Sequence, residues 1–599
     1  MEGKVTIGVD VGGTNTDGVV VRQGKVLGRA KAPTSPDVTS GIVECVELCL
    51  KDAGMDGRQV QALMIGTTHF LNAIVESRGL ARVAVVRLCG PATRDVPHFS
   101  GWPAHLRTAV EGPVYFLRGG LEFDGSEAGA LDPAEVESAA KDMVARGVTQ
   151  VAVVGCFSPL RSEQEEAAGN VIAGIFAKAH RPLDLVLSHE VGQLGFLERE
   201  SASVLNAALR PLARKTVRAF RVSLSGCGLR CPLFVTRNDG TIVGATAAAT
   251  SPIFFTTSGP TNSMRGASFL TSVAKAVVLD VGGSTTDAGA LDSGFPRLAS
   301  SVVLLGGVRT NFRSPDVVSI GLGGGSTVHL GEPGEAPVVG PRSVGYRIRE
   351  EALVFGGATL TVTDVLVRLG LMRVGDAALV AHLDEERCQA AYDHMQGMLE
   401  ELVDRMKGSS EAVDVIAVGG GSPVIGNRLR GVCQVMRPPD FSVANAVGAA
   451  AAQICGSVDR ICRIPSEFPS REAAFEALVR DAEKNAQLQG AVSGCEVLYK
   501  LDDPLAYVPG ASRFQVKVVG NVDWAKFSSD QVVGEAEEKE EEEEEEEEGV
   551  SGVCTADPEE PRNDGNDAGE PCSGSRATAE ENRGEGWVLT VEDIHQIGL

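Results

Sequence analysis

The chain has 599 residues, of which 43% are hydrophobic, and a formal net charge of −25. A single hydrophobic core stops growing well below this length, so we expect more than one domain. The acidity is local: residues 535–599 hold 23 acidic and 4 basic side chains, which leaves a net charge of −6 for residues 1–534. We therefore expect no nucleic-acid surface, and without a long apolar run or an apolar leader we predict neither a membrane span nor a secretory signal.

The 13 cysteines are scattered and lack the spacing of a disulfide framework. This pattern predicts reduced thiols and a cytoplasmic protein. Cys227 and Cys231 have the spacing of half a zinc site, but ordinary thiols are the favoured interpretation.

The chain opens with a predicted β-hairpin formed by residues 5–11 and 17–21. Its turn reads DVGGTNTD over residues 10–17, with Asp10 at the end of the first strand. Glycines without a Cβ let backbone N–H groups approach phosphate oxygens, and Asp10 can hold a hydrated Mg²⁺ ion. Asp17 either orients water or substrate or caps the turn. The predicted phosphate contacts are Gly12, Gly13, Thr14 and Asn15.

An alternation of helices and strands follows the hairpin and indicates an α/β fold. We predict helices over residues 39–52 and 71–77 and strands over 62–65, 83–88, 151–157 and 185–187. Residues 91–130 are rich in proline, glycine and aromatic residues and are interpreted as an insertion that forms a substrate-side surface. Residues 162–165 (SEQE) predict a capping box that opens a helix to about residue 178.

Three polar residues near these elements are candidates for substrate contact or proton transfer, namely His69, His189 and Glu190. For His189, which precedes a helix, a structural hydrogen bond is an equal expectation. A long helix is then predicted over residues 197–220, with a kink or break at Pro211. Glu198 and Arg199 on this helix are interpreted as a solvated or interlobe ion pair. Residues 233–237 and 241–243 form a predicted hairpin.

The opening motif recurs half a chain later, where residues 280–287 read DVGGSTTD. Asp280 corresponds to Asp10, and Asp287 corresponds to Asp17. Further on, a predicted strand over residues 413–418 enters a third glycine-rich turn, and a helix is predicted over 445–455. Two such detailed hairpins predict two related lobes that close on one polyphosphate, with Mg²⁺ at Asp10 and Asp280. The added nucleotide contacts are Gly282, Gly283, Ser284, Thr285, Gly419, Gly420 and Gly421.

The three turns, in this order, resemble the phosphate-1, phosphate-2 and adenosine motifs of the actin-like ATPase superfamily, which includes sugar kinases and heat-shock chaperones. The resemblance implies an α/β fold with two actin-like, ribonuclease H-like lobes around a cleft for ATP and Mg²⁺. A non-catalytic nucleotide switch of the actin or chaperone kind is one function open to such a fold.

Within that superfamily, the chain resembles the hydantoinase/5-oxoprolinase A-type family over roughly residues 4–525. The resemblance rests on residues 66–79 (GTTHFLNAIVESRG), 188–207 (SHEVGQLGFLERESASVLNA), 444–450 (ANAVGAA) and 504–520 (PLAYVPGASRFQVKVVG), besides the glycine turns. It implies ATP-dependent opening of a cyclic amide, such as a hydantoin or 5-oxoproline, by phosphoryl activation of the lactam oxygen. It also implies a B-type partner subunit and a homo- or hetero-oligomer.

The same resemblance includes ATP-dependent ketone carboxylase subunits, which are the alternative enzyme class. The sequence departs from the family where Ile65 replaces a histidine before the GTT turn and where Leu71-Asn72 replaces a Thr-Asn pair. These departures leave the substrate open.

We expect four regions: a lobe over residues 1–195, a second lobe over 196–465, a β-containing closing segment over 466–526 and an acidic tail over 527–599. The glutamate run repels itself and has almost nothing apolar to bury, which predicts a disordered tail or linker. Residues 587–594 (WVLTVEDI) are either a frayed end or the start of a further domain.

Overall fold

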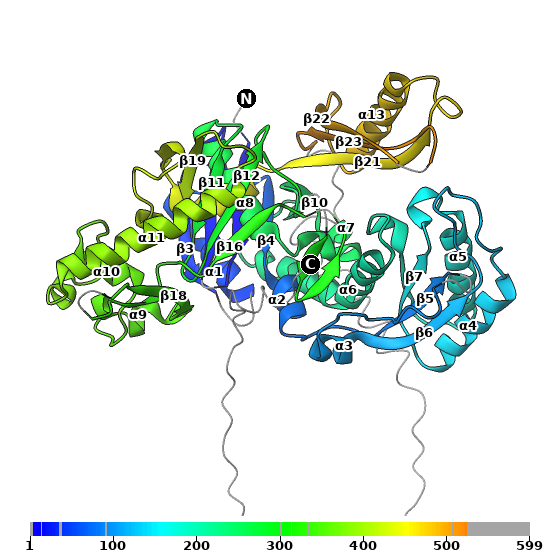
Figure 1. Cartoon of the computed structure of the whole chain (residues 1–599), viewed down its shortest axis with the longest axis horizontal. Coiled ribbons are helices and arrows are strands. Elements are labelled where there is room, and N and C mark those ends of the chain that lie inside the picture. Colours follow the sequence, from blue (N-terminus) through cyan, green and yellow to red (C-terminus); the bar gives the residue numbers. More distant parts are fainter. Residues whose placement is uncertain are drawn as a thin grey trace, which may run out of the picture. The chain divides into compact units, whose positions relative to one another are not determined.

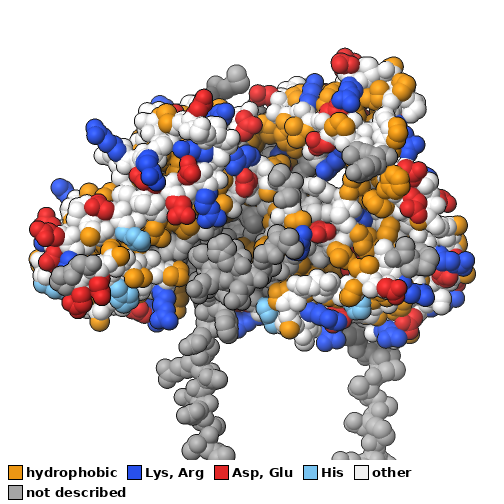
Figure 2. Space-filling view, in the orientation of Figure 1, with side chains coloured by type: hydrophobic (Ala, Val, Ile, Leu, Met, Phe, Trp, Pro, Cys, Tyr) orange, Lys and Arg blue, Asp and Glu red, His pale blue; other side chains and the backbone are white. Residues whose placement is uncertain are grey.

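The computed structural model describes residues 4–523, except 14, 35–38, 90–92, 300–301, 313, 333–334 and 506–507. The expected acidic tail and Thr14 therefore lie outside the described residues. No helix in the described part is long and apolar enough to cross a membrane. On the face shown in Figure 2, basic and acidic side chains are interspersed.

The first sheet has nine strands in the order β22-β23-β21-β10-β9-β4-β1-β2-β3. Strand β1 runs antiparallel to β2 and parallel to β4, and β4 runs parallel to β9. Strands from both sides of residue 195, the boundary expected from the sequence, thus share one sheet. The strands are β1 (Val5–Val11), β2 (Asn15–Arg22), β3 (Lys25–Pro33), β4 (Ala62–Thr67), β9 (Leu233–Thr236), β10 (Thr241–Gly244), β21 (Gln453–Arg463), β22 (Glu496–Pro504) and β23 (Ala511–Gly520).

The second sheet repeats the pattern of the first around its own hairpin. Strand β11 (Val277–Val281) runs antiparallel to β12 (Thr286–Asp292) and parallel to β19 (Val413–Val418). In register, Asp10 faces Asp17 and Asp280 faces Asp287. The predicted sequence repeat is therefore also a repeat of strand geometry. The remaining strands of this sheet are β13 (Phe295–Pro296), β16 (Val317–Ile320) and β20 (Val432–Met436).

The third sheet is parallel and has the order β6-β5-β7-β8, with α4 and α5 beside it (Figure 1). Alternate side chains of β5 and β7 pack on α4 and α5 or on α6, which is why these strands read as continuous apolar runs. The elements are β5 (Val83–Leu88), β6 (Glu111–Leu117), β7 (Gln150–Gly155), β8 (Asp184–Leu187), α4 (Pro133–Ala145), α5 (Glu163–Lys178) and α6 (Phe196–Ser225).

Several sequence predictions are corrected by these elements. The expected insertion over residues 91–130 contains helix α3 (Ala104–Val110) and strand β6, where Pro113 is tolerated because β6 is an edge strand. Helix α6 continues through Pro211 without a break. The helix expected over residues 445–455 ends early, as α12 (Ala444–Ala450), because Gln453 and Ile454 pair with β10 as the start of β21.

Helices α8 (Ser258–Thr271) and α12 connect the first two sheets. Helix α8 contacts strands of both, namely β1 and β4 of the first and β11, β12 and β19 of the second. The two helices touch backbone to backbone: a Cβ on Gly266 would lie 1.8 Å from Ala444 O, and one on Gly448 would lie 1.9 Å from Asn262 O. Only glycine permits this approach, so α8 and α12 form one unit between the sheets.

Three of the remaining helices pack against the sheets, and two short hairpins belong to the second half of the chain. Helix α1 packs against β2 and β3, α11 packs against β12 and β16, and α13 packs against β21 and β23 (Figure 1). These elements are α1 (Thr39–Ala53), α2 (His69–Val75), α7 (Ala245–Thr250), α9 (Ile348–Glu351), α10 (Val362–Arg368), α11 (Glu385–Met406), α13 (Arg471–Leu488), β14 (Val303–Leu305), β15 (Val308–Thr310), β17 (Ser326–His329) and β18 (Val338–Ser343).

Candidate active site

The two predicted metal ligands occupy equivalent places in the two related sheets. Asp10 is buried near the end of β1, and Asp280 is half-buried near the end of β11. Each lies against a glycine at the end of the neighbouring parallel strand. A Cβ on Gly66 would lie 2.3 Å from Asp10 Oδ1, and a Cβ on Gly419 would lie 2.3 Å from Asp280 Oδ1. Both carboxylates therefore sit at carboxyl ends of strands, where α/β folds bind ligands.

Neighbouring residues of α8 hold the two aspartates. Asn262 Nδ2 donates a hydrogen bond to Asp10 Oδ1 (2.7 Å), and Ser263 Oγ donates one to Asp280 Oδ2 (2.5 Å). Asn262 Oδ1 is buried without a hydrogen-bond partner. One helix thus links the equivalent acids of two sheets. Sequence reasoning missed both residues, and the adjacent polar pair in this small-residue segment was the only local signal.

A second amide and a lysine complete the network around the first hairpin. Asn445 Nδ2, at the start of α12, donates to Asp10 Oδ2 (3.1 Å) and to Asp17 Oδ2 (2.8 Å). Lys31 Nζ lies 2.6 Å from Asp17 Oδ1. Asp17 is therefore held as part of a charged network, whereas Asp287 accepts a hydrogen bond from Ser319.

The two aspartates carry unusually high proton affinity. Burial raises the pKa of Asp280 to about 7, and the charges of Asp287 and Asp10 act in the same direction against the hydrogen bond from Ser263. Burial raises the pKa of Asp10 to about 6, with the charge of Asp17 adding to it. The charge of Lys31 opposes this rise at Asp10, but burial is the largest cause at both aspartates and outweighs it.

The residues present fit Mg²⁺, because carboxylate oxygens are the ligands that this ion prefers. Among the described residues, no group of three or more His, Cys, Asp or Glu side chains is arranged to hold a metal. The protein would thus supply few ligands directly. This suits Mg²⁺, which usually keeps several waters and takes oxygens from bound phosphates.

The raised pKa values predict a pH-dependent stability in metal-free buffer. Between about pH 4 and pH 7 the folded state keeps protons that the unfolded chain has released, so the stabilisation present below pH 4 is lost as pH rises through 7. The shift at Asp280 corresponds to roughly 4 kcal/mol. We expect Asp280→Asn to melt at a higher temperature than the wild type at pH 8 and at a similar one at pH 4.5, measured by circular dichroism. Equal differences at both pH values would contradict this.

The two hairpin turns have the same hydrogen bond. Gly12 N donates to Asn15 O (3.0 Å), and Gly282 N donates to Thr285 O (2.9 Å). Gly283, Ser284 and Thr285 belong to the second turn, and Gly13 belongs to the first. The carbonyls of Gly282 and Gly283 accept hydrogen bonds from the backbone of the glycine-rich segment 321–326. This segment therefore supports the second turn.

The third turn meets the second at the end of β11. Gly421 N donates to Val281 O (2.9 Å), and Gly419 has a φ of +83°, in the left-handed region that favours glycine. Gly420 lies between them with open space at its Cβ position. The structure thus brings the second and third turns together, while the first is tied to them through α8.

His69 begins α2, directly after β4 and its Thr67-Thr68 turn. Burial lowers its pKa, so the neutral ring predominates at pH 7. The ring packs against Phe70, with centroids 6.1 Å apart.

His189 and Glu190 follow β8 in the third sheet, and His189 is paired with a buried acid. His189 Nδ1 lies 2.7 Å from Glu165 Oε2, and Glu165 Oε1 accepts from Ser188 Oγ (2.6 Å) and Gly155 N (2.7 Å). Burial opposes the charged ring, but the hydrogen bond and charge of Glu165 outweigh it and raise the pKa of His189. The capping box expected at residues 162–165 is therefore wrong: Glu165 points inward and orients His189. Glu190 is exposed.

Arg199 also corrects a sequence interpretation. It is fully buried, and its guanidinium donates to Ser188 Oγ (2.9 Å) and to the carbonyls of Gln193 (2.7 Å) and Leu194 (2.8 Å). Arg199 therefore holds the loop that follows His189 by hydrogen bonds and does not form the solvated ion pair expected from the sequence. Glu198 lies 3.5 Å from Arg309.

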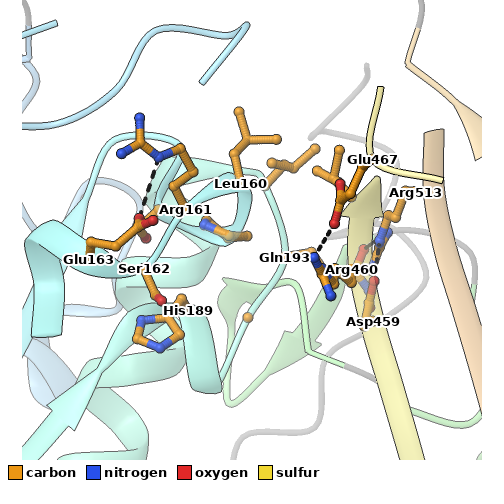
Figure 3. Close-up of a pocket in the computed structure, with 15 residues that line it drawn as sticks. Leu160, Arg161, Ser162, Glu163, His189, Gln193, Asp459, Arg460, Glu467 and Arg513 are labelled. Carbon is orange, nitrogen blue, oxygen red and sulfur yellow. Dashed lines mark hydrogen bonds and ion pairs between the residues drawn. The ribbon is translucent and has the colours of Figure 1, made fainter. Parts of the chain in front are cut away.

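His189 lines a cavity of about 550 Å³ between the third sheet and β21 and β23 (Figure 3). Residues 158–163 and His189 form one side, and Asp459 and Arg460 of β21 and Arg513 of β23 form the opposite side. Three ion pairs, Arg161–Glu163, Arg460–Glu467 and Arg513–Asp459, line its walls. Neither the glycine turns nor His69 lines this cavity.

The fold and these motifs define a recognisable class of protein. The chain matches the family model for the hydantoinase/oxoprolinase N-terminal region over residues 6–176 and the hydantoinase/oxoprolinase model over residues 199–386. The chain belongs to the hydantoinase/oxoprolinase family, as the sequence motifs predict.

Two curated relatives are similar over much of the chain. Caprolactamase subunit alpha of Pseudomonas jessenii is 25% identical over 498 residues, which cover 76% of this chain and 67% of the relative. The acetophenone carboxylase gamma subunit of Aromatoleum aromaticum is 24% identical over 391 residues, which cover 61% of this chain and 53% of the relative. The chain thus spans about half to two thirds of the length of these relatives.

Two solved structures share the fold. ATP-dependent caprolactamase from Pseudomonas jessenii has a TM-score of 0.68 at 19% identity, covering 86% of this chain and 87% of that one. Nucleotide-free acetone carboxylase has a TM-score of 0.62 at 19% identity, covering 88% and 89%. These likenesses confirm the predicted mixed α/β class.

Proposed function

We propose that the chain is an ATP-dependent enzyme that activates a cyclic amide by phosphoryl transfer to the lactam oxygen and so permits ring opening. The observation that carries this proposal is the matched pair Asp10 and Asp280, held on equivalent hairpins by adjacent residues of α8. Two actin-like lobes around an ATP cleft would account for this symmetry. The relative named ATP-dependent caprolactamase supports both the cofactor and the substrate class.

Each group of residues has a task in this reaction. Backbone N–H groups of the first two turns, with the Ser284 and Thr285 hydroxyls, would bind phosphate oxygens, and the third turn would contact the adenosine. Asp10 and Asp280 would hold Mg²⁺ directly or through water. This ion supplies positive charge where the transferred phosphoryl group develops negative charge.

His189 is suited to donate a proton to the nitrogen of the substrate's lactam ring. When the C–N bond of the ring breaks, the nitrogen must gain a proton, and the Glu165 partner keeps the imidazole oriented and more basic. His69, neutral at pH 7, is the second candidate for substrate contact at the end of β4. Glu190 is a third, exposed candidate.

We also propose that the chain works with a partner subunit. Three relatives are each named as one subunit, namely caprolactamase subunit alpha, the acetophenone carboxylase gamma subunit and the acetone carboxylase beta subunit of Xanthobacter autotrophicus. A B-type hydantoinase/oxoprolinase subunit in a hetero-oligomer is the partner that the family resemblance implies.

The test is a substrate-panel ATPase assay on the chain with and without such a partner. We expect ATP hydrolysis to be slow in the absence of a substrate. It should rise at least tenfold with one small lactam or hydantoin, because the lactam oxygen then replaces water as the phosphoryl acceptor. Slow turnover that is indifferent to every lactam would contradict ring opening and favour a nucleotide switch.

A ketone carboxylase is the second candidate, favoured by the carboxylase subunits among the relatives. In that case ATP hydrolysis should require both bicarbonate and a ketone. The same assay distinguishes the two enzymes when bicarbonate and acetophenone are added to the panel.

A further inference from the structure

A serine outside the glycine motifs contacts both the backbone and a side chain of the second glycine turn. Ser343 is the half-buried last residue of β18. Its hydroxyl accepts hydrogen bonds from Ser284 Oγ (3.0 Å) and from Gly345 N (3.1 Å). It also donates a long hydrogen bond to Gly283 O (3.5 Å). One side chain of a distant hairpin is therefore bonded to two successive residues of the turn.

Ser343 and the glycine-rich segment 321–326 meet at the same carbonyl of the turn. Gly325 N donates to Gly283 O (2.6 Å), the atom that Ser343 Oγ also contacts. A Cβ on Gly325 would lie 3.1 Å from Ser343 Oγ, so a larger residue there would crowd the serine. Val344 N donates to Gly325 O (3.0 Å). The end of β18 and the glycine segment thus form one support behind the turn.

This support determines where the N–H groups of the turn point. In a trans peptide the C=O and N–H bonds point in opposite directions. Because the carbonyls of Gly282 and Gly283 are bonded to segment 321–326, the N–H groups of Gly283 and Ser284 point away from it. In the described part of the chain, neither of these two N–H groups has a hydrogen-bond acceptor. Two successive N–H groups on one side of a turn form a concave site for an anion.

The equivalent carbonyl of the first turn is also bonded to a hydroxyl. Gly12 corresponds to Gly282, and Gly12 O accepts a hydrogen bond from Thr34 Oγ1 (2.8 Å). Thr34 directly follows β3, so this hydroxyl comes from a different element than Ser343 does. A side-chain hydroxyl behind the turn therefore recurs in both hairpins. The recurrence favours a role in orienting the turns over incidental packing.

We propose that Ser343 is a positioning residue for phosphate binding by the second turn. It holds the side chain of Ser284 and the carbonyl of Gly283, and through them it keeps the two free N–H groups directed at the phosphate before the nucleotide binds. Donors that are already in place cost no reordering when the ligand arrives. The inference rests on the proposed function and deepens it, because it names a residue outside the motifs that determines the affinity for the nucleotide.

Isothermal titration calorimetry of the full chain with Mg²⁺ and a non-hydrolysable ATP analogue tests this role without turnover. We expect Ser343→Ala to weaken binding about 5- to 30-fold, because the hydrogen bonds behind the turn are lost. Ser343→Thr keeps the hydroxyl and should stay within about threefold of the wild type. Thr327→Ala is the matched control, because Thr327 lies in the same hairpin but its hydroxyl donates to Arg342 O (3.3 Å) and not to the turn. It should bind the analogue like the wild type.

A double-mutant cycle with Ser284→Ala shows whether Ser343 acts through the turn. If it does, Ser343→Ala should weaken binding less in the Ser284→Ala background than in the wild type. A loss of folding stability alone would give the same change in both backgrounds. Thermal melts without ligand show which variants fold. If Ser343→Ala does not fold, Ser343→Cys carries the comparison, because a thiol is of similar size but is only a weak hydrogen-bonding group.

The outcomes separate this inference from the proposed function. Equal affinity in the wild type and Ser343→Ala, an equal loss in both backgrounds, or a loss that threonine does not restore would overturn the role of Ser343 and leave ATP use intact. A wild-type chain that does not bind the analogue would refute ATP use and this inference together. Nucleotide binding that depends on Ser343, combined with ATP hydrolysis that is indifferent to lactams, would support the inference and contradict ring opening.

Discussion

Asp10→Asn and Asp280→Asn should each lower lactam-dependent ATP hydrolysis by about 10²- to 10⁴-fold. Each substitution removes one of the two charges proposed to hold Mg²⁺ against the phosphates, and asparagine keeps the shape of the side chain. Asp280→Asn is the cleaner variant because the Ser263 hydroxyl, which now donates, can also accept. At Asp10 the new amide would face the donating Asn445 Nδ2, so some loss of stability is expected there.

The measurement is steady-state ATPase activity with the stimulating lactam, together with thermal melts to confirm folding. Glu137→Gln is the matched control, because Glu137 is an exposed carboxylate that pairs with Lys141 on α4. It should keep wild-type activity. Wild-type rates in both aspartate variants would refute a site shared between the two sheets.

Glu200→Gln should destabilise the protein by about 3 to 5 kcal/mol. Arg87 is fully buried, and its guanidinium forms two hydrogen bonds with Glu200, of 2.5 and 2.7 Å, between the rings of Phe116 and Phe196. Neutralising the acid leaves a buried charge without compensation. Since this pair joins β5 to α6, the third sheet should loosen from the helix behind His189.

Urea denaturation followed by circular dichroism measures this effect. Glu111→Gln, which breaks the exposed pair with Arg107, should cost about 0 to 1 kcal/mol. The double variant Arg87→Met/Glu200→Leu should recover most of the loss, because apolar side chains of similar volume can replace a buried ion pair. A Glu200→Gln protein as stable as the Glu111→Gln control would show that the pair contributes little.

The parts of the site that the sequence predicted are those formed by local chain geometry. The hairpin 5–22 with its Gly-Gly turn, its repeat at 277–292 and the third turn at 419–421 depend on residues close together in the chain. A strand that ends in Asp and Gly-Gly has few other conformations available, so the motif alone indicates both the turn and the acid. The α/β class follows in the same way from apolar runs that alternate with helical patterns.

Other features depended on contacts between distant residues. Residues 111–117 lie in the region interpreted as an insertion, yet they form an edge strand because β5 offers a parallel partner. Residues 453–455 continue an alanine-rich helix in the sequence, but pairing with β10 makes them a strand. Glu165 has the spacing of a cap, but its carboxylate points inward to the half-buried His189 and to two buried donors, Ser188 Oγ and Gly155 N.

By itself, the sequence determined the family, the α/β class, the two aspartates and the three glycine turns, because each of these depends on residues that are close together along the chain. Only the tertiary structure showed that Asn262 and Ser263 of one helix hold both aspartates and that Glu165 orients His189. These hydrogen bonds join side chains that are 17, 24 and 252 residues apart, and their partners become defined only when the sheets and helices have packed.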